Sequence, residues 1–231
     1  MTSVSKTQVD KLGDRIRKGK LEEGDSKRLD SYRRLFAEAY EEVVAIIRDS
    51  TKLDPTGRTA KSTTSITEKL RREKIRLTQM QDIAGCRLVV PDVAAQNQVV
   101  DRLMTVLPQA DLVDRRKKPS FGYRAVHIVA TARGRPVEIQ VRTELQHLWA
   151  QLSEKLSDVF GPAIKYGGGG SEYQDHLHRF SRLIAEYQDQ EVGLLAGELS
   201  GQMAEQRRKI RQLLEDSITT WGSTPKPEGG K

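Results

Sequence analysis

Two runs of alternating apolar and polar residues in the middle of the chain predict a β-hairpin. Every second residue is apolar from Val126 to Ala130 and again from Val137 to Val141, and Arg133-Gly134 lies between the two runs. Alternation with a period of two is typical of strands with one buried face, and glycine supplies the positive φ that a two-residue loop requires. This loop sets the cross-strand pairs on the apolar face, which are Ala130 with Val137, Ile128 with Ile139 and Val126 with Val141.

The other face of this hairpin carries an unusual combination of side chains. An aromatic ring, an imidazole, a carboxylate, an amide and a guanidinium share it; they belong to Tyr123, His127, Glu138, Gln140 and Arg142. A sheet face with only a structural role more often carries Thr, Ser, Lys and Glu in no special order. The pattern therefore predicts that this face is functional.

Further periodic patterns predict the elements around the hairpin. Steps of three and four between apolar residues predict a helix from Ser26 to just before Asp54-Pro55, and others after Pro91-Asp92, over 144–158, from Ser171 and over 192–218. The segment DIAGCRLVVPD, residues 82–92, predicts a strand that buries Ala84, Cys86, Leu88 and Val90. The apolar stripes of the terminal helices fit packing on the core or on a second subunit of a homo-oligomer.

These elements predict an α/β (α+β) fold in which helices flank a mixed sheet of about five strands. We expect an N-terminal helical extension over 1–54, a central sheet domain over 55–166, C-terminal helices over 167–220 and a disordered tail over 221–231. The tail, WGSTPKPEGGK, is rich in Pro and Gly and poor in residues that build a core. A chain of 231 residues is long enough for one sizeable core with appended helices.

Charge and composition narrow the functional classes. A formal net charge of +7 and a pI near 9.5 favour anionic partners such as nucleotides or RNA. The single cysteine, Cys86, excludes an internal disulfide framework and fits a reducing compartment. No apolar run approaches the ~20 residues of a membrane span, and the N-terminus lacks the apolar core of a signal peptide. We therefore expect a cytoplasmic protein without a membrane partner.

A basic segment, RTAKSTTSITEKLRR, occupies residues 58–72. Ser65 and Glu68 fit a capping box, so we expect a helix to begin at Ser65, with Lys69 and Arg72 on one of its faces. A helix N-terminus beside Lys and Arg can hold phosphate groups. A solvated helix face is the more common role of such charges.

Several of these motifs together resemble one enzyme family. GYRAVH and VEIQVRT, with DIAGCR upstream, resemble the synthetase domain of the RelA/SpoT family of (p)ppGpp synthetases, from about Arg58 to Tyr166. These enzymes transfer a pyrophosphate group from ATP to the 3′-hydroxyl of GDP or GTP. The resemblance implies a nucleotidyltransferase-like fold over 55–166, GTP diphosphokinase activity, and the type of a small stand-alone alarmone synthetase.

The resemblance also implies roles for individual residues. Asp82 and Glu138 are expected to hold Mg²⁺ and to be catalytic, with Glu138 accepting the proton of the attacking hydroxyl. The residues expected to bind ATP are Arg58, Lys61, Ser65, Lys69, Arg72 and Arg87. Those expected to bind the acceptor are Lys118, Tyr123, His127, Gln140 and His147, with Tyr123 stacking on the guanine.

Two departures from the family pattern leave alternatives open. The family arginine that precedes Lys61 by two residues is replaced by Thr59, with Arg58 beside it, and Phe121 stands where many members have Asn. Some small members of the family are toxins that pyrophosphorylate the 3′ end of tRNA, with an antitoxin as partner, and others make adenosine alarmones. An inactive RNA- or nucleotide-binding module is a third interpretation, which the presence of both Asp82 and Glu138 weakens.

Overall fold

The predicted hairpin is present in the structure. A computed structural model of the chain describes residues 5–192 and 201–223, and in it β4 (Val126–Ala132) and β5 (Arg135–Thr143) flank the loop. Arg133 and Gly134 have φ angles of 49° and 69°, the left-handed pair that a two-residue hairpin loop requires. All six residues predicted for the apolar face are at most 1% exposed. Their pairwise register stays a prediction.

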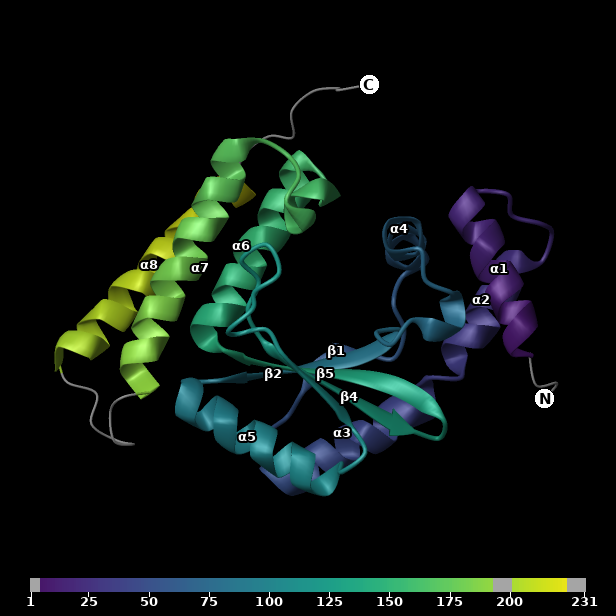
Figure 1. The fold of residues 1–231 in the computed structure, drawn as a ribbon, viewed down its shortest axis with the longest axis horizontal. Coiled ribbons are helices and arrows are strands. Elements are labelled where there is room, and N and C mark those ends of the chain that lie inside the picture. Colours follow the sequence, from purple (N-terminus) through teal and green to yellow (C-terminus); the bar gives the residue numbers. More distant parts are fainter. Residues whose placement is uncertain (1–4, 193–200, 224–231) are drawn as a thin grey trace. The chain divides into compact units, whose positions relative to one another are not determined.

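The hairpin belongs to a five-stranded mixed sheet, as predicted. Its strand order is β1-β2-β5-β4-β3, in which β1 is Thr56–Arg58, β2 is Ala84–Val90 and β3 is Asp111–Asp114. Strand β2 buries Ala84, Cys86, Leu88 and Val90, the four residues that the alternation selects. Helices flank the sheet, so the predicted α/β fold class is confirmed (Figure 1).

Contacts between residues divide the chain into two compact units. The first unit contains Met1–Leu88, Arg102–Leu112 and Ile128–Gln140, and the second contains Val89–Asp101, Val113–His127 and Val141–Lys231. The division falls within β2, β3, β4, β5 and α5 (Val93–Val106), so these elements contribute residues to both units.

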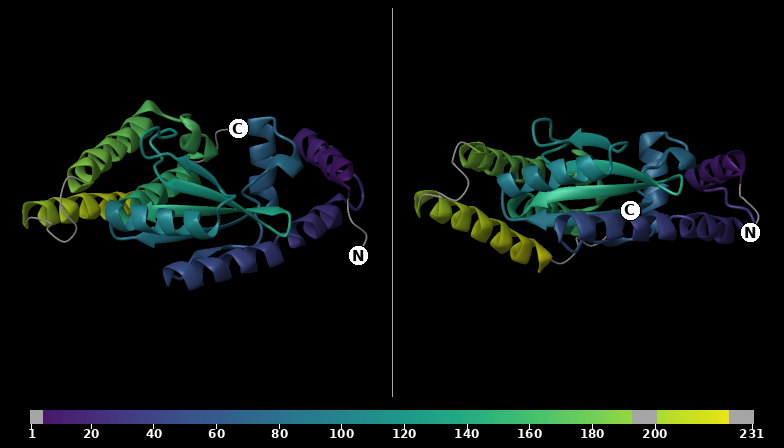
Figure 2. Two further views of the ribbon diagram at one scale, coloured as in Figure 1. Left: turned by 60° about the horizontal axis from the view of Figure 1, so that its bottom comes forward. Right: turned by 90° about the horizontal axis from the view of Figure 1, so that it is seen from below.

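The first unit contains the N-terminal helices, and here one prediction is wrong. The single helix expected from Ser26 is instead two helices, α2 (Asp25–Arg34) and α3 (Ala37–Thr51), which follow one another along nearly one line (Figure 2). Leu35 and Phe36 donate backbone hydrogen bonds to residues three positions back, which ends α2 and shifts the apolar stripe. Ile47 is buried as a result, whereas the predicted Ile46 is only half-buried.

The tip of the hairpin is held on these helices by charged side chains. Arg133 forms ion pairs with Glu38 and Glu42 of α3, at 2.8 and 2.9 Å. The guanidinium of Arg135 lies over the rings of Tyr32 and Phe36, 5.7 and 5.5 Å from their centroids. The unit also contains α1 (Lys6–Lys18), α4 (Thr63–Glu73) and a 3₁₀ turn, η1 (Leu77–Gln79).

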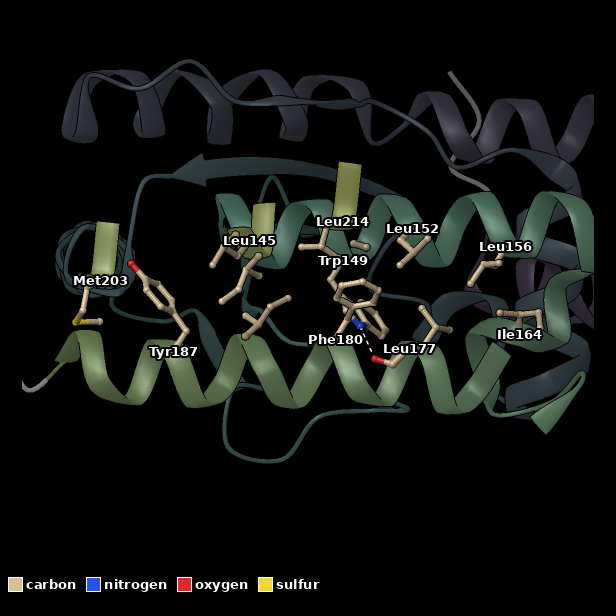
Figure 3. Packing of buried hydrophobic residues seen from close by; sticks show 13 residues of the cluster. Leu145, Trp149, Leu152, Leu156, Ile164, Leu177, Phe180, Tyr187, Met203 and Leu214 are labelled. Carbon is tan, nitrogen blue, oxygen red and sulfur yellow. Dashed lines mark hydrogen bonds between the residues drawn. The ribbon is translucent and has the colours of Figure 1, made fainter. Parts of the chain in front are cut away.

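The second unit has a helical core. It is formed by α6 (Glu144–Phe160), a 3₁₀ turn η2 (Pro162–Tyr166), α7 (Ser171–Val192) and α8 (Gly201–Gly222). Figure 3 shows Trp149 of α6 among the buried apolar residues, with its indole N–H donating to the carbonyl of Leu177 on α7 at 2.8 Å. These helices agree with the predicted ones, except that 193–200 lie outside the described residues.

The C-terminal part of α8 overlaps the predicted tail. The helix runs to Gly222 and includes Trp221, which packs edge-on against Phe160 and Tyr173 with ring centroids 5.6 and 5.5 Å apart. The rest of the predicted tail, from 224 to 231, lies outside the described residues. Among the helices of the described ranges, none combines the length and the apolar character needed to cross a membrane.

Candidate functional site

In the first unit a carboxylate is held between two lysines. The Nζ atoms of Lys61 and Lys69 lie 2.7 and 2.8 Å from the two carboxylate oxygens of Asp82, and the three side chains are 14–19% exposed. Burial alone would raise the pKa of Asp82, but the two ammonium groups outweigh it and lower the pKa to about 2. Asp82 is therefore ionised at neutral pH.

The local fold places both lysines beside Asp82. Lys61 is fixed by its backbone N–H, which donates to the carbonyl of Ile83 at 2.6 Å. Helix α4 begins after Ser62, whose hydroxyl accepts the N–H of Ser65, so the predicted start at Ser65 is wrong by one turn. The wrong start follows from two serines three residues apart, either of which fits the N-cap preference. Ile66 and Leu70 anchor the apolar face of α4.

Glu138 lies on β5 next to Gly85 of the neighbouring strand β2. Arg58 pairs with Gly85 across β1 and β2, and a Cβ on Gly85 would lie 3.5 Å from the Cβ of Glu138. Residues that face each other across strands lie on the same face of the sheet. Arg58 on β1 and Glu138 on β5 therefore lie on either side of Gly85, which has no side chain. Gln140, predicted to bind the acceptor, donates to the Glu138 carboxylate at 2.7 Å.

In the second unit, two polar side chains of the hairpin contact Tyr123. The Tyr123 hydroxyl lies 3.1 Å from His127 Nε2 and accepts from Arg142 at 3.0 Å. The Arg142 guanidinium carbon is 5.1 Å from the centroid of the Tyr123 ring, and the Trp149 ring centroid is 6.3 Å away. We call Tyr123, His127 and Arg142 the tyrosine cluster. It brings together two of the predicted acceptor residues.

A tight turn presents Tyr123. Ser120 and Tyr123 exchange backbone hydrogen bonds of 3.2 and 2.9 Å around Phe121 and Gly122, whose φ angles are 50° and 87°. A Cβ on Gly122 would lie 2.8 Å from the Trp149 ring. Glycine is therefore required here by the backbone conformation and by the close approach of Trp149. Phe121 adopts the left-handed region, which Asn tolerates better than Phe.

The other predicted residues occupy varied surroundings. Lys118 is exposed and its side chain forms no hydrogen bond or ion pair with the described residues. Ser65 bonds to Ser62, and Arg72 pairs with Glu73 at 2.8 Å. Arg87 and His147 are half-buried, on β2 and α6. Within the first unit, the structure therefore brings Lys61 and Lys69 to Asp82.

The donor atoms of the first unit fit a hard cation that is completed by a ligand. Among the described residues, no three His, Cys, Asp or Glu side chains lie close enough to hold a metal ion by themselves. Mg²⁺ usually needs only one or two carboxylates when phosphates and water supply the other oxygens. The ionised carboxylate of Asp82 and the carboxylate of Glu138 are donors of this kind.

Comparison with known proteins identifies the family. Residues 57–157 match the model of the region found in RelA/SpoT proteins. A GTP pyrophosphokinase of Bacillus subtilis, YjbM, is 34% identical over 175 residues, which cover 67% of this chain and 76% of that protein. The chain belongs to the RelA/SpoT family. The match confirms the family resemblance of GYRAVH, VEIQVRT and DIAGCR.

Two further comparisons match one uncharacterised protein and one crystal structure. An uncharacterised protein of Mycobacterium tuberculosis is 38% identical over 113 residues, 46% of this chain and 41% of that protein. The chain thus spans less than half the length of that relative. The crystal structure of small alarmone synthetase 1 from Bacillus subtilis bound to its product pppGpp has a TM-score of 0.59 at 23% identity, over 72% of this chain and 96% of that one. This similarity confirms the fold.

The sequence prediction did not assign a role to Arg142, which the structure places against Tyr123. Arg142 is 5% exposed. A signal was present, since the alternation puts Arg142 on the same face of the hairpin as Tyr123 and His127. The face was predicted to be functional, but residue type alone does not distinguish an arginine that contacts Tyr123 from a solvated one.

Proposed function

We propose that the protein is a GTP diphosphokinase that transfers pyrophosphate from ATP to the 3′-hydroxyl of GDP or GTP, making (p)ppGpp. The observation that carries this proposal is the ionised Asp82 between Lys61 and Lys69 in a chain of the RelA/SpoT family. The name of the Bacillus subtilis relative, GTP pyrophosphokinase, supports the same activity.

The first unit is the proposed donor side. Lys61 and Lys69 are two ammonium groups within 3 Å of one carboxylate. The triphosphate of ATP would provide them with further anionic partners, and Arg58, Arg72 and Arg87 add positive charge from β1, α4 and β2. Catalysis of phosphoryl-type transfer depends mainly on such positioning and charge neutralisation.

Asp82 and Glu138 would hold Mg²⁺ together with the ATP phosphates. When bound, the cation neutralises charge that develops on the phosphate oxygens. Asp82 contacts two ammonium groups, and Glu138 accepts a hydrogen bond from the Gln140 amide. By the family resemblance, Glu138 is also the proposed acceptor of the proton of the attacking hydroxyl.

In the proposed reaction the acceptor 3′-oxygen attacks the β-phosphorus of ATP. The bond between that phosphorus and the α,β-bridging oxygen breaks, AMP leaves, and the proton of the 3′-hydroxyl passes to the Glu138 carboxylate. Tyr123 would stack on the guanine, while Arg142 and His127 hold the Tyr123 hydroxyl and thereby fix the ring.

The alternative activities receive less support. The Bacillus subtilis relative is named for a guanine nucleotide, and neither the tRNA reaction, with its antitoxin, nor adenosine alarmone synthesis is supported by the relatives named above. An inactive binding module is disfavoured because both candidate metal-binding carboxylates, Asp82 and Glu138, are present. Because the proposed substrates are free nucleotides, we place the activity in the cytoplasm.

A panel of acceptors tests the proposal. Purified protein would be incubated with Mg²⁺, ATP labelled in its β-phosphate and, separately, GDP, GTP, ADP or bulk tRNA, at several salt concentrations. We expect label in GDP and GTP with weak salt dependence, since an RNA acceptor adds phosphate contacts that salt screens. Labelled tRNA that falls steeply with salt, without a guanine-nucleotide product, would contradict it.

A further inference from the structure

The second unit contains a pocket that the proposed reaction does not use. Its volume is about 650 Å³, and residues from the N-terminal part of α5, from the loop after β3 and from the C-terminal part of α7 line it. The polar lining residues are Asn97, Arg116, Lys117, Arg124, Gln188 and Asp189. Tyr123 is not among them, although it is the neighbour of Arg124 in the sequence. The pocket is therefore separate from the tyrosine cluster.

The charge of the lining favours an anion. Three cationic side chains, Arg116, Lys117 and Arg124, and one carboxylate, Asp189, line the pocket. Arg116 is held in place by Asp114, at 2.6 Å, and by the side-chain oxygen of Asn97, also at 2.6 Å. Its position on the pocket wall is thus fixed before any ligand binds.

Arg124 is a partly buried cation whose hydrogen-bond partners are neutral. Its guanidinium donates to the hydroxyl of Ser181 at 3.1 Å and to the backbone carbonyl of Arg116. Burial lowers the pKa of Arg124, and Asp189 opposes this only through space. A charged group that has lost water gains most from an ionic partner, so Arg124 would be stabilised by an anion in the pocket.

Lys117 and Gln188 complete the set of donors. Lys117 is exposed and forms no hydrogen bond or ion pair with the described residues. Gln188 donates to the hydroxyl of Thr143 at 2.7 Å and accepts from Gln146 at 3.0 Å, in a buried network. The Gln188 side chain is therefore held by this network, whereas the Lys117 side chain can adjust to a ligand.

We propose that this pocket is a second binding site, for a small phosphorylated ligand. The guanidinium of Arg124 and the ammonium group of Lys117, beside the Asp114-paired Arg116, match the several oxygens of a phosphate better than those of a single carboxylate. The volume lies within the ~300–1,000 Å³ range of ligand pockets and admits a ligand of nucleotide size. The site does not depend on the proposed catalytic activity.

A site-specific titration tests the proposal. Inorganic pyrophosphate would be added to ¹⁵N-labelled protein, and its Kd would be read from the NMR signals of the Asn97 and Gln188 side-chain amides and the Lys117 backbone amide. These signals come from residues of the pocket, so they do not report phosphate that is bound by Lys61 and Lys69 beside Asp82. Parallel titrations with GMP and inorganic triphosphate would distinguish a nucleotide from an inorganic ligand.

Three variants make the outcome specific. Lys117→Gln should weaken binding about tenfold, since one charge-assisted contact is lost, and Asp189→Asn should tighten it several-fold by removing the one opposing charge. Lys165→Gln, the same charge change on exposed η2, is the control and should leave the Kd unchanged. Circular dichroism would verify that each variant is folded.

The result that would overturn the proposal is either the absence of saturable shifts at millimolar pyrophosphate or equal weakening by Lys117→Gln and Lys165→Gln. Neither result bears on the proposed pyrophosphate transfer, because the readout is binding without turnover. Conversely, a protein that binds pyrophosphate through Lys117 and makes no (p)ppGpp would contradict only the proposed function.

Discussion

The Asp82 cluster predicts a specific dependence of stability on pH. The pKa of this carboxyl is about 2 in the folded chain, against 3.8 for an unperturbed aspartate. Because the folded-state pKa is the lower one, the ionised carboxylate stabilises the fold fully above about pH 5, and this contribution is lost as the pH falls through the folded-state pKa. At about 1.4 kcal/mol per pKa unit, the full contribution is on the order of 2 kcal/mol.

The perturbation that isolates this contribution is Asp82→Asn. The ion-paired Asp25, whose pKa Arg15 also lowers, titrates in the same acidic range, so the wild type alone does not report on Asp82. The free energy of unfolding would be measured by urea denaturation of both proteins at several pH values. We expect the difference between wild type and Asp82→Asn to shrink by about 1 kcal/mol between pH 5 and pH 3.

An exposed aspartate provides the matched control. Asp49 lies on the exposed face of α3, so Asp49→Asn removes one carboxylate without altering the cluster of Asp82, Lys61 and Lys69. The change with pH should be larger for Asp82→Asn than for Asp49→Asn. If the Asp82→Asn difference is constant with pH, the two lysines do not hold an ionised carboxylate, and the assignment of this cluster fails.

Three further predictions test the site, two of them with a control variant. Gly122→Ala should lower the free energy of unfolding by about 2–4 kcal/mol, because it adds a clash with Trp149 to the left-handed backbone cost. Gly134→Ala, at a similar φ in open space, is the control and should cost only about 1 kcal/mol. Equal losses in the two variants would show that the Trp149 contact is unimportant. Tyr123→Ala should weaken acceptor binding by roughly 1–3 kcal/mol. Tyr123→Phe keeps the ring and should retain most of the acceptor affinity. Nucleotide titrations in which both variants bind like wild type would remove Tyr123 from the site. Lys69→Ala should weaken ATP binding more than acceptor binding, and equal losses in separate titrations would argue against a dedicated donor site.

Local patterns account for the parts of the fold that could be predicted. The hairpin follows from strict alternation around a glycine-containing loop, and Asp92 caps α5 through its 2.7 Å bond to the N–H of Ala95. The break between α2 and α3 gives no such signal, because Leu35 and Phe36 are compatible with a continuous helix. The burial of Phe36 at 1% exposure shows that tertiary packing decides there.

The candidate site was predictable to a similar extent. The pattern and the resemblance selected Asp82, Lys61 and Lys69, but the pairing of one carboxylate with both lysines depends on segments that are up to 21 residues apart. The pocket beside Arg124 was not predictable, because its lining comes from three segments that are distant in the sequence. Residue type and spacing do not encode such contacts.

The measurement that tests the proposed function most directly is the stoichiometry of the phosphorus products. Phosphorus NMR of a reaction with ATP, GDP and Mg²⁺ would follow AMP, ADP and the guanine nucleotide together. We predict one AMP for each guanosine that carries a new diphosphate at its 3′-oxygen, and no such product from Glu138→Gln. Formation of ADP in place of AMP, or AMP with free pyrophosphate and unchanged GDP, would contradict pyrophosphate transfer.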